Sequence, residues 1–110
     1  EVILSVDDNV SIDKNIIPKE YMLEQNFPNP FNPSTEIKFS IPKSENVSLI
    51  VYDLLGNEVK KIVERELKEG QYKYKWFGKN NLGDKISAGM YFYKIQAGSF
   101  IKTKKMILLK

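Results

Sequence analysis

From Glu36 to the end of the chain, short apolar runs alternate with turn residues, and no stretch keeps helical periodicity over a useful length. Short runs bounded by Gly, Pro and Asn are typical of the strands of a β-sandwich. We expect strands at 36–41, 47–53, 59–63, 71–76, 89–96 and 100–109. The sequence therefore predicts an all-β protein, an antiparallel β-sandwich of about seven strands.

The alternation assigns a face to the apolar side chains of the early strands. Ile37, Phe39 and Ile41 share one face of the first strand, which Pro42 ends. The run 47–53 is apolar at most positions, which predicts a central strand buried on both sides.

The strand at 71–76 carries an aromatic stripe. Tyr72, Tyr74 and Trp76 face one way, and lysines separate them. Such a stripe is either half of a hydrophobic core or a platform for stacking sugars or bases, and we expect the core. In the loop 78–84 that follows, Asn81, Asp84 and their neighbours are candidate calcium ligands. The loop lacks dense carboxylate spacing, so a turn is expected there.

The strand at 89–96 places Tyr91, Tyr93 and Ile95 on one face and Met90 and Phe92 on the other. A tight hairpin at 97–99 then leads into the last strand. The triplets Gly70-Gln71-Tyr72 and Gly89-Met90-Tyr91 echo each other at two strand starts. Each is expected to place a tyrosine whose hydroxyl bonds the backbone, as in a tyrosine corner.

Residues 23–35, which we call the Asn-Pro segment, are rich in proline and asparagine. Proline fixes φ, lacks an N–H and keeps the preceding residue extended, so this segment is stiff and non-helical. Phe27 and Phe31 are free to plug an apolar surface, and Asn26, Asn29 and Asn32 are candidate turn initiators. A rigid linker is the simpler interpretation of this composition.

Residues 1–20 are acidic and show no sustained period. A short strand is expected at 2–6 and a turn at 7–9, within a linker or the end of a preceding domain. The predicted organisation is therefore a linker at 1–20 and one β-sandwich domain at 21–110. No apolar run is long enough for a transmembrane helix.

The composition excludes most catalytic chemistry. The chain has no Cys and no His, which removes thiol nucleophiles, the commonest general base and the commonest metal ligands. It also lacks a nucleophile elbow and a glycine-rich phosphate loop. We therefore expect a protein that is not an enzyme and that needs no metal and no cofactor.

Charge is unevenly distributed along the chain. Residues 71–110 carry nine lysines and one acid, whereas residues 1–70 have an excess of acids. A basic region can attract nucleic acid. These lysines alternate with apolar residues, as on the outward face of strands, so nucleic-acid binding is not expected.

The landmarks of the chain follow a fixed order. They are Leu-x-Gln-Asn-Phe-Pro-Asn-Pro-Phe-Asn-Pro-Ser-Thr from Leu23, Val51-Tyr52-Asp53-Leu54-Leu55-Gly56, Leu67-x-x-Gly70-x-Tyr72, Trp76-x-Gly78, Asn81-x-Gly83, Ser87-Ala88-Gly89-Met90-Tyr91-Phe92-Tyr93 and Lys104-Lys105-Met106. Together they resemble the C-terminal sorting domain (type A) of the type IX secretion system over residues 21–110. The part from Trp76 to Ile95 is also similar to the immunoglobulin-like domain of the flagellar hook-capping protein. An immunoglobulin-like sandwich is therefore implied.

The resemblance implies a secretion address rather than an activity. The domain would follow an N-terminal cargo, which reaches the periplasm of a Gram-negative bacterium. The type IX outer-membrane translocon would recognise it, and a sortase-like peptidase would act on it, leaving the cargo secreted or on the cell surface.

The same resemblance supplies candidate site residues. Those for recognition by the translocon form the extreme C-terminus: Lys102, Lys104, Lys105, Met106, Ile107, Leu108, Leu109 and Lys110. Those of structural motifs are Pro28, Pro30, Phe31, Pro33, Gly70, Tyr72, Trp76, Gly89 and Tyr91. Phe77 stands where the family usually has Asp, which leaves a turn or metal role at this position in doubt.

The last strand admits two interpretations. At a sheet edge, its backbone could bind a partner by strand addition. Lys104 and Lys105 would then contact an acidic receptor or guard the edge against aggregation, and both remain open. The apolar residues 107–109 would belong to the signal or to the core.

Two other functions compete with sorting. A carbohydrate-binding module would use the aromatic stripe of 71–76, and it requires that stripe to be exposed. A structural module of the hook-cap type would self-associate, and it would not need the C-terminal lysines.

Overall fold

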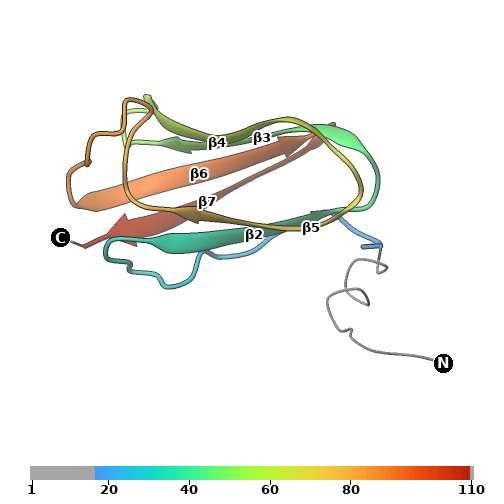
Figure 1. The fold of residues 1–110 in the computed structure, drawn as a ribbon, viewed down its shortest axis with the longest axis horizontal. Coiled ribbons are helices and arrows are strands. Elements are labelled where there is room, and N and C mark those ends of the chain that lie inside the picture. The colour runs from blue at the N-terminus through green and yellow to red at the C-terminus, as the bar shows by residue number, and fades with distance from the viewer. Residues whose placement is uncertain (1–16, 110) are drawn as a thin grey trace.

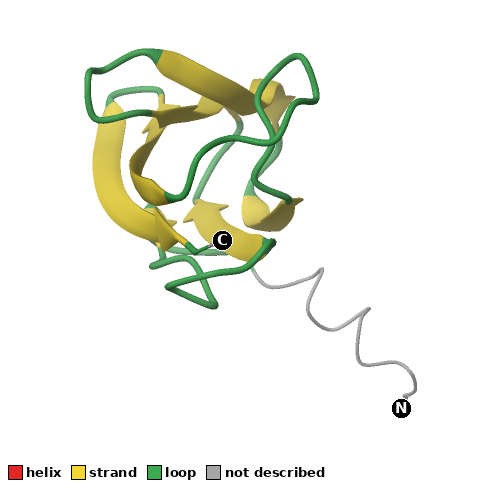
Figure 2. Cartoon of the chain, turned by 90° about the vertical axis from the view of Figure 1, so that its left-hand side faces the viewer, coloured by secondary structure: helices red, strands yellow, loops and turns green. Residues whose placement is uncertain are grey.

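The computed structural model describes residues 17–109, which form seven strands and no helix (Figure 1, Figure 2). The strands are β1 (Met22–Leu23), β2 (Thr35–Ile41), β3 (Glu45–Tyr52), β4 (Glu58–Leu67), β5 (Gly70–Trp76), β6 (Gly89–Ala97) and β7 (Phe100–Leu108). Residues 17–109 contain no helix that is long and apolar enough to cross a membrane. The strand expected at 2–6, the turn at 7–9 and Lys110 lie outside the described residues.

The strands form two antiparallel sheets that pack face to face (Figure 1). One sheet has the order β1-β2-β5 and the other has the order β4-β3-β6-β7. The predicted all-β sandwich is therefore confirmed. β7 lies at one edge of the four-stranded sheet and pairs with β6 along its whole length, from Phe100 opposite Ala97 to Leu108 opposite Gly89.

The core fills the space between the sheets. Ile37, Phe39 and Ile41 of β2 are buried, as the alternation predicted. Tyr93 and Ile95 of β6 face them from the other sheet and are also buried. Because strand side chains alternate between faces, each sheet supplies one apolar face to this core.

The prediction that β3 is buried on both sides is wrong. Val47, Leu49 and Val51 face the core and are buried, whereas Ile50 and Tyr52 on the other face are half-buried. β3 is central in its sheet, between β4 and β6. A two-layer sandwich covers one face of each sheet, so a central strand still has a face toward solvent.

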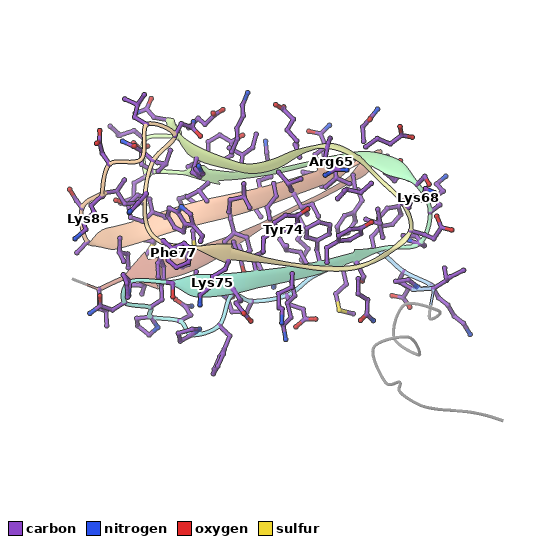
Figure 3. All side chains as sticks on the ribbon, viewed as in Figure 1. Arg65, Lys68, Tyr74, Lys75, Phe77 and Lys85 are labelled. Carbon is purple, nitrogen blue, oxygen red and sulfur yellow. The ribbon has the colours of Figure 1, made fainter. Side chains whose placement is uncertain are left out.

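The aromatic stripe of β5 belongs to the core, as expected. Trp76 is buried and its indole N–H donates to the carbonyl of Lys79 at 2.9 Å. Tyr72 and Tyr74 are half-buried and stack on Phe39, with ring centroids 5.4 and 5.9 Å apart. Figure 3 shows Tyr74 between the two sheets.

Both tyrosine corners predicted from the sequence are present. The Tyr72 hydroxyl donates to the Lys68 carbonyl at 2.6 Å, and the Tyr91 hydroxyl donates to the Ser87 carbonyl at 2.6 Å. In each case the acceptor lies four residues earlier, so the hydroxyl fastens the incoming loop to the start of its strand. The repeated triplets therefore mark the same local structure twice.

Two loops at strand ends share one hydrogen-bond pattern. The Asp53 carboxylate accepts from the N–H groups of Leu55 and Asn57, each at 2.9 Å. The Asn80 side chain accepts in the same way from the N–H groups two and four residues further on. The bond from the Asn57 backbone is the main cause that lowers the pKa of Asp53. The loop 78–84 is thus a turn closed by its own Asn80.

Candidate functional site

The candidate recognition residues divide between the two faces of β7. Met106 and Leu108 face the core and are buried, at 0% and 5% exposure. Ile107 and Leu109 face outward, at 38% and 50%. The inward pair contributes packing in the folded domain, and the outward pair is accessible to a partner.

The lysines of β7 lie at the surface. Lys102 and Lys105 are exposed and Lys104 is half-buried. Among the described residues none of them forms a salt bridge. Their charges are therefore available to an acidic partner, and they also discourage edge-to-edge aggregation.

The Asn-Pro segment links the edges of the two sheets. Its first part pairs with β2, because Leu23 lies opposite Phe39 and Phe27 exchanges backbone hydrogen bonds with Glu36. Phe31 then forms a parallel bridge with Leu108 of β7. The segment thus leaves one sheet, crosses the side of the sandwich and joins the other sheet.

Four hydrogen bonds fasten this segment to the outer edge of β7. Phe31 N–H donates to the Ile107 carbonyl at 2.9 Å, and Leu109 N–H donates to the Phe31 carbonyl at 2.8 Å. Ile107 N–H donates to the Asn29 side-chain oxygen at 3.0 Å, and the Gln25 side-chain amide donates to the Lys105 carbonyl at 2.7 Å. The edge from residue 105 to residue 109 is therefore already paired.

This pairing limits strand addition at the candidate site. Backbone groups alternate between the two edges of a strand, so Ile101 and Thr103 point outward like Ile107. No described residue bonds to the outward backbone groups of Ile101 and Thr103. The free edge of β7 thus covers its first half, whereas the extreme C-terminus offers a partner its side chains.

Buried contacts hold the Asn-Pro segment in place. Phe31 is 1% exposed and packs on Trp76 with ring centroids 5.7 Å apart. Tyr93 is fully buried, and its hydroxyl accepts from Asn26 N–H at 2.8 Å and donates to the Glu24 carbonyl at 2.8 Å. This burial raises the pKa of Tyr93 to about 12.

The structure corrects two expectations for the segment. The linker interpretation is wrong for residues 23–35, because their backbone is paired with both sheets. Phe27 does not plug an apolar surface, since it is 78% exposed, whereas Phe31 does. Asn26 does act locally, donating to the Pro28 carbonyl at 3.2 Å. Asn29 instead bonds Ile107, which lies 78 residues away.

The prolines of the segment lie at its surface. Pro28, Pro30 and Pro33 are exposed, and the peptide bond before each of them is cis. The Pro28 carbonyl also accepts from the Thr35 hydroxyl at 2.9 Å. The prolines themselves are therefore not buried. The buried residues that hold the segment in place, Asn26 and Phe31, lie beside them in the sequence.

Phe77 and Gly78 lie beside the end of β7. Phe77 is 53% exposed, and the Lys75 ammonium lies 5.5 Å from its ring centroid (Figure 3). Gly78 has φ +70°, and a Cβ there would lie 3.3 Å from the Pro33 carbonyl oxygen and 3.6 Å from Leu108. A residue without a side chain is needed where the loop meets the C-terminus.

The start of the domain also contacts β7. Tyr21 stacks on Phe100 with ring centroids 5.0 Å apart, and its hydroxyl donates to the Glu45 carboxylate. That hydrogen bond is the main cause that raises the pKa of Tyr21. Residues 21–31 therefore contact β7 at its first residue and again along its last residues.

Nothing in the described range forms a group of three or more His, Cys, Asp and Glu side chains able to hold a metal ion. The candidate site itself offers apolar side chains, lysines and a backbone edge that is already paired. Its Gln25 and Asn29 contacts with β7 were missed, because no local pattern shows which distant strand a side chain will reach.

Comparison with known proteins places this geometry in a family. A family model described as the FlgD Ig-like domain matches residues 31–99. The chain belongs to this family. The immunoglobulin-like sandwich implied by the resemblance is thereby confirmed. The matched region begins within the Asn-Pro segment, includes β2 to β6 and stops before β7.

Three solved structures are similar to this chain. FlgD from P. aeruginosa is 25% identical, with a TM-score of 0.52 over 67% of this chain and 58% of that chain. Dimeric latent PorU from Porphyromonas gingivalis is 24% identical, with a TM-score of 0.63 over 86% of this chain. PorZ from the same organism, an essential bacterial surface component of the type IX secretion system, is 14% identical, with a TM-score of 0.54 over 82%.

The coverage of these structures is unequal. This chain covers 10% of the length of PorU and 11% of the length of PorZ, so the same fold is a small part of each of these proteins. No curated protein sequence matches the chain. The comparisons therefore establish the fold, and the function must be argued from the site.

Proposed function

We propose that this domain is a non-catalytic C-terminal sorting domain. Its last strand addresses an N-terminal cargo to the outer-membrane translocon of the type IX secretion system. The observation that carries the proposal is the division of β7, whose core-facing residues anchor the strand while Lys105, Ile107 and Leu109 face solvent. A receptor can recognise such a signal because its side chains are accessible and its backbone is held in a fixed conformation.

The likeness to PorU and PorZ supports this proposal. PorZ is a surface component of the type IX system, and its similarity covers 82% of this chain. The similarity to PorU covers 86% and includes more of the chain than the family match does. The same fold is thus present in a protein of that system, and the ordered motifs of residues 21–110 agree with it.

Recognition in this proposal uses side chains rather than strand addition at the C-terminus. The Asn-Pro segment occupies the outer backbone edge from residue 105 to residue 109. An acidic receptor surface would pair with Lys105 and bury the outward Ile107 and Leu109. Complementary charge of this kind gives specificity and fast association.

The remaining parts of the proposal concern the whole protein. The sorting domain would begin near residue 21, and the contacts of Tyr21 with Phe100 and Glu45 support this start. A sortase-like peptidase would cleave upstream of it, so that the cargo is released or held at the cell surface after passage through the periplasm.

A structural module of the hook-cap type is the second candidate, and the family match to the FlgD Ig-like domain favours it. It predicts self-association through the sandwich. The carbohydrate-binding alternative has less support, because Trp76 is 3% exposed and presents no free ring face to a sugar.

The test is a fusion of the 110-residue chain to a fluorescent reporter that is exported to the periplasm of a type IX-competent host. Reporter in the medium or on the surface, absent when the chain is omitted, supports sorting. Retention in the periplasm together with a concentration-dependent oligomer of the purified chain would favour the structural module. Ending the chain at Thr103 also removes the buried Met106 and Leu108, so that variant needs a check of folding.

A further inference from the structure

A groove lies on the outward face of the four-stranded sheet, beside the Asn-Pro segment. Its floor contains Met90, Phe92 and Ile107, and its wall contains Gln25 and Asn29. The pairing of β6 with β7 places Met90 directly opposite Ile107. Two strands and the segment thus enclose one apolar strip.

The apolar floor is not part of the core. Met90 and Phe92 alternate with the buried Tyr91 and Tyr93, so they point to the other face of β6. Met90 is 37% exposed and Ile107 is 38% exposed. Apolar side chains gathered in an open groove are typical of a surface that binds a partner.

The wall of the groove is fixed to its floor. The Gln25 side chain holds the Lys105 carbonyl at 2.7 Å, and the Asn29 side chain holds Ile107 N–H at 3.0 Å. Tyr93 anchors the same segment from inside the core through Asn26. A groove that exists before binding loses little entropy when its occupant arrives.

The charged residues that line the groove are all positive. Lys104 and Lys105 line it, and no carboxylate from the described part of the chain does so. Lys94 lies on the same face, with its ammonium 5.5 Å from the ring centroid of Tyr52. Since neither β7 lysine has a salt-bridge partner in the described range, the groove favours an anionic occupant.

We propose that this groove binds an extended acidic peptide segment of the translocon. Its apolar side chains would pack on Met90, Phe92 and Ile107, and its carboxylates would pair with Lys105. An extended segment fits because its side chains alternate, as the apolar and basic groups do here. This inference rests on the proposed sorting function and extends the recognition surface from β7 to β6 and the Asn-Pro segment.

The first test uses the purified 110-residue chain and two capped hexapeptides, one alternating valine with glutamate and one alternating valine with lysine. Nuclear magnetic resonance titration should shift the Met90, Phe92 and Ile107 signals with the acidic peptide. Lys105→Glu should weaken this binding about fivefold, because an attraction becomes a repulsion at an exposed site. Lys73→Glu on the outer face of β5 is the matched control and should leave the affinity unchanged.

Equal shifts with both peptides, or shifts spread over all the lysines of the chain, would overturn the groove proposal. So would an unchanged affinity in Lys105→Glu. If the acidic peptide saturates the groove but the reporter fusion is not exported, the groove stands and the sorting function fails.

The second test replaces Met90 by a photoreactive benzoylphenylalanine in the reporter fusion and identifies the cross-linked segment in the host. A segment rich in Asp and Glu supports the proposal. A segment rich in Lys and Arg overturns it, while export of the reporter shows independently whether sorting holds.

Discussion

The hydroxyl of Tyr93 is the contact that ties the Asn-Pro segment to the core, so its removal is the sharpest test of the architecture. Tyr93→Phe keeps the buried ring and deletes one oxygen. That oxygen accepts from Asn26 N–H and donates to the Glu24 carbonyl, both at 2.8 Å. The variant therefore leaves an N–H and a carbonyl without their partner.

The magnitude follows from the burial of the two groups. Asn26 is 2% exposed, so its stranded N–H costs about 1–3 kcal/mol of unfolding free energy. The Glu24 carbonyl loses a hydrogen bond that is only partly buried, which costs about 0.5–1.5 kcal/mol. We expect Tyr93→Phe to lower the unfolding free energy by roughly 1.5–4.5 kcal/mol.

Urea unfolding followed by tryptophan fluorescence measures this change, because Trp76 is buried against Phe31 of the same segment. Tyr74→Phe is the matched control, since the Tyr74 ring stacks on Phe39 and none of the hydrogen bonds among the described residues uses its hydroxyl. The control should stay within about 0.5 kcal/mol of the parent chain. A loss in Tyr93→Phe as small as in this control would refute the reasoning.

Three further predictions concern the same side of the sandwich. Phe31→Ala should lower the unfolding free energy by about 3–5 kcal/mol in the same urea assay, because it leaves a cavity beside Trp76; a change below 1 kcal/mol would contradict this. Asn29→Ala should speed amide hydrogen exchange of Ile107 roughly 2- to 12-fold, since one acceptor is lost, and an unchanged rate would show that the bond is unimportant. Burial raises the pKa of Tyr93 from 10.0 to about 12, so the unfolded chain loses this proton first and stability should fall as pH rises from 10 toward 12. Tyr93→Phe should show a shallower fall, and an identical slope would contradict the assignment.

Much of the sandwich could be predicted because its signals are local. Ile37, Phe39 and Ile41 alternate with polar residues, and a period of two allows one buried face. The triplets beginning at Gly70 and Gly89 gave two tyrosine corners, since each hydroxyl reaches a carbonyl four residues away. Such contacts depend on neighbouring residues and are therefore visible in a pattern.

The contacts of the Asn-Pro segment could not be predicted in this way. Asn29 bonds Ile107 across 78 positions, and Gln25 reaches Lys105 across 80. The composition indicated that the segment is stiff, but it did not indicate that the segment pairs with the outer edge of β7. The composition of β3 misled for a related reason, because Ile50 and Tyr52 are apolar on a face that the fold leaves half-open.

The most direct test of the account compares export of the reporter fusion by two double variants with intact cores. One carries Lys105→Glu on the outward face of β7 and Leu109→Ser directly after the strand, and the other carries Lys73→Glu and Lys75→Glu on the outward face of β5. Equal melting temperatures would show that both domains are folded. The account predicts that the β7 variant stays in the periplasm while the β5 variant reaches the surface or medium like the parent. Equal export of both variants would contradict the claim that the outward side chains of β7 carry the address.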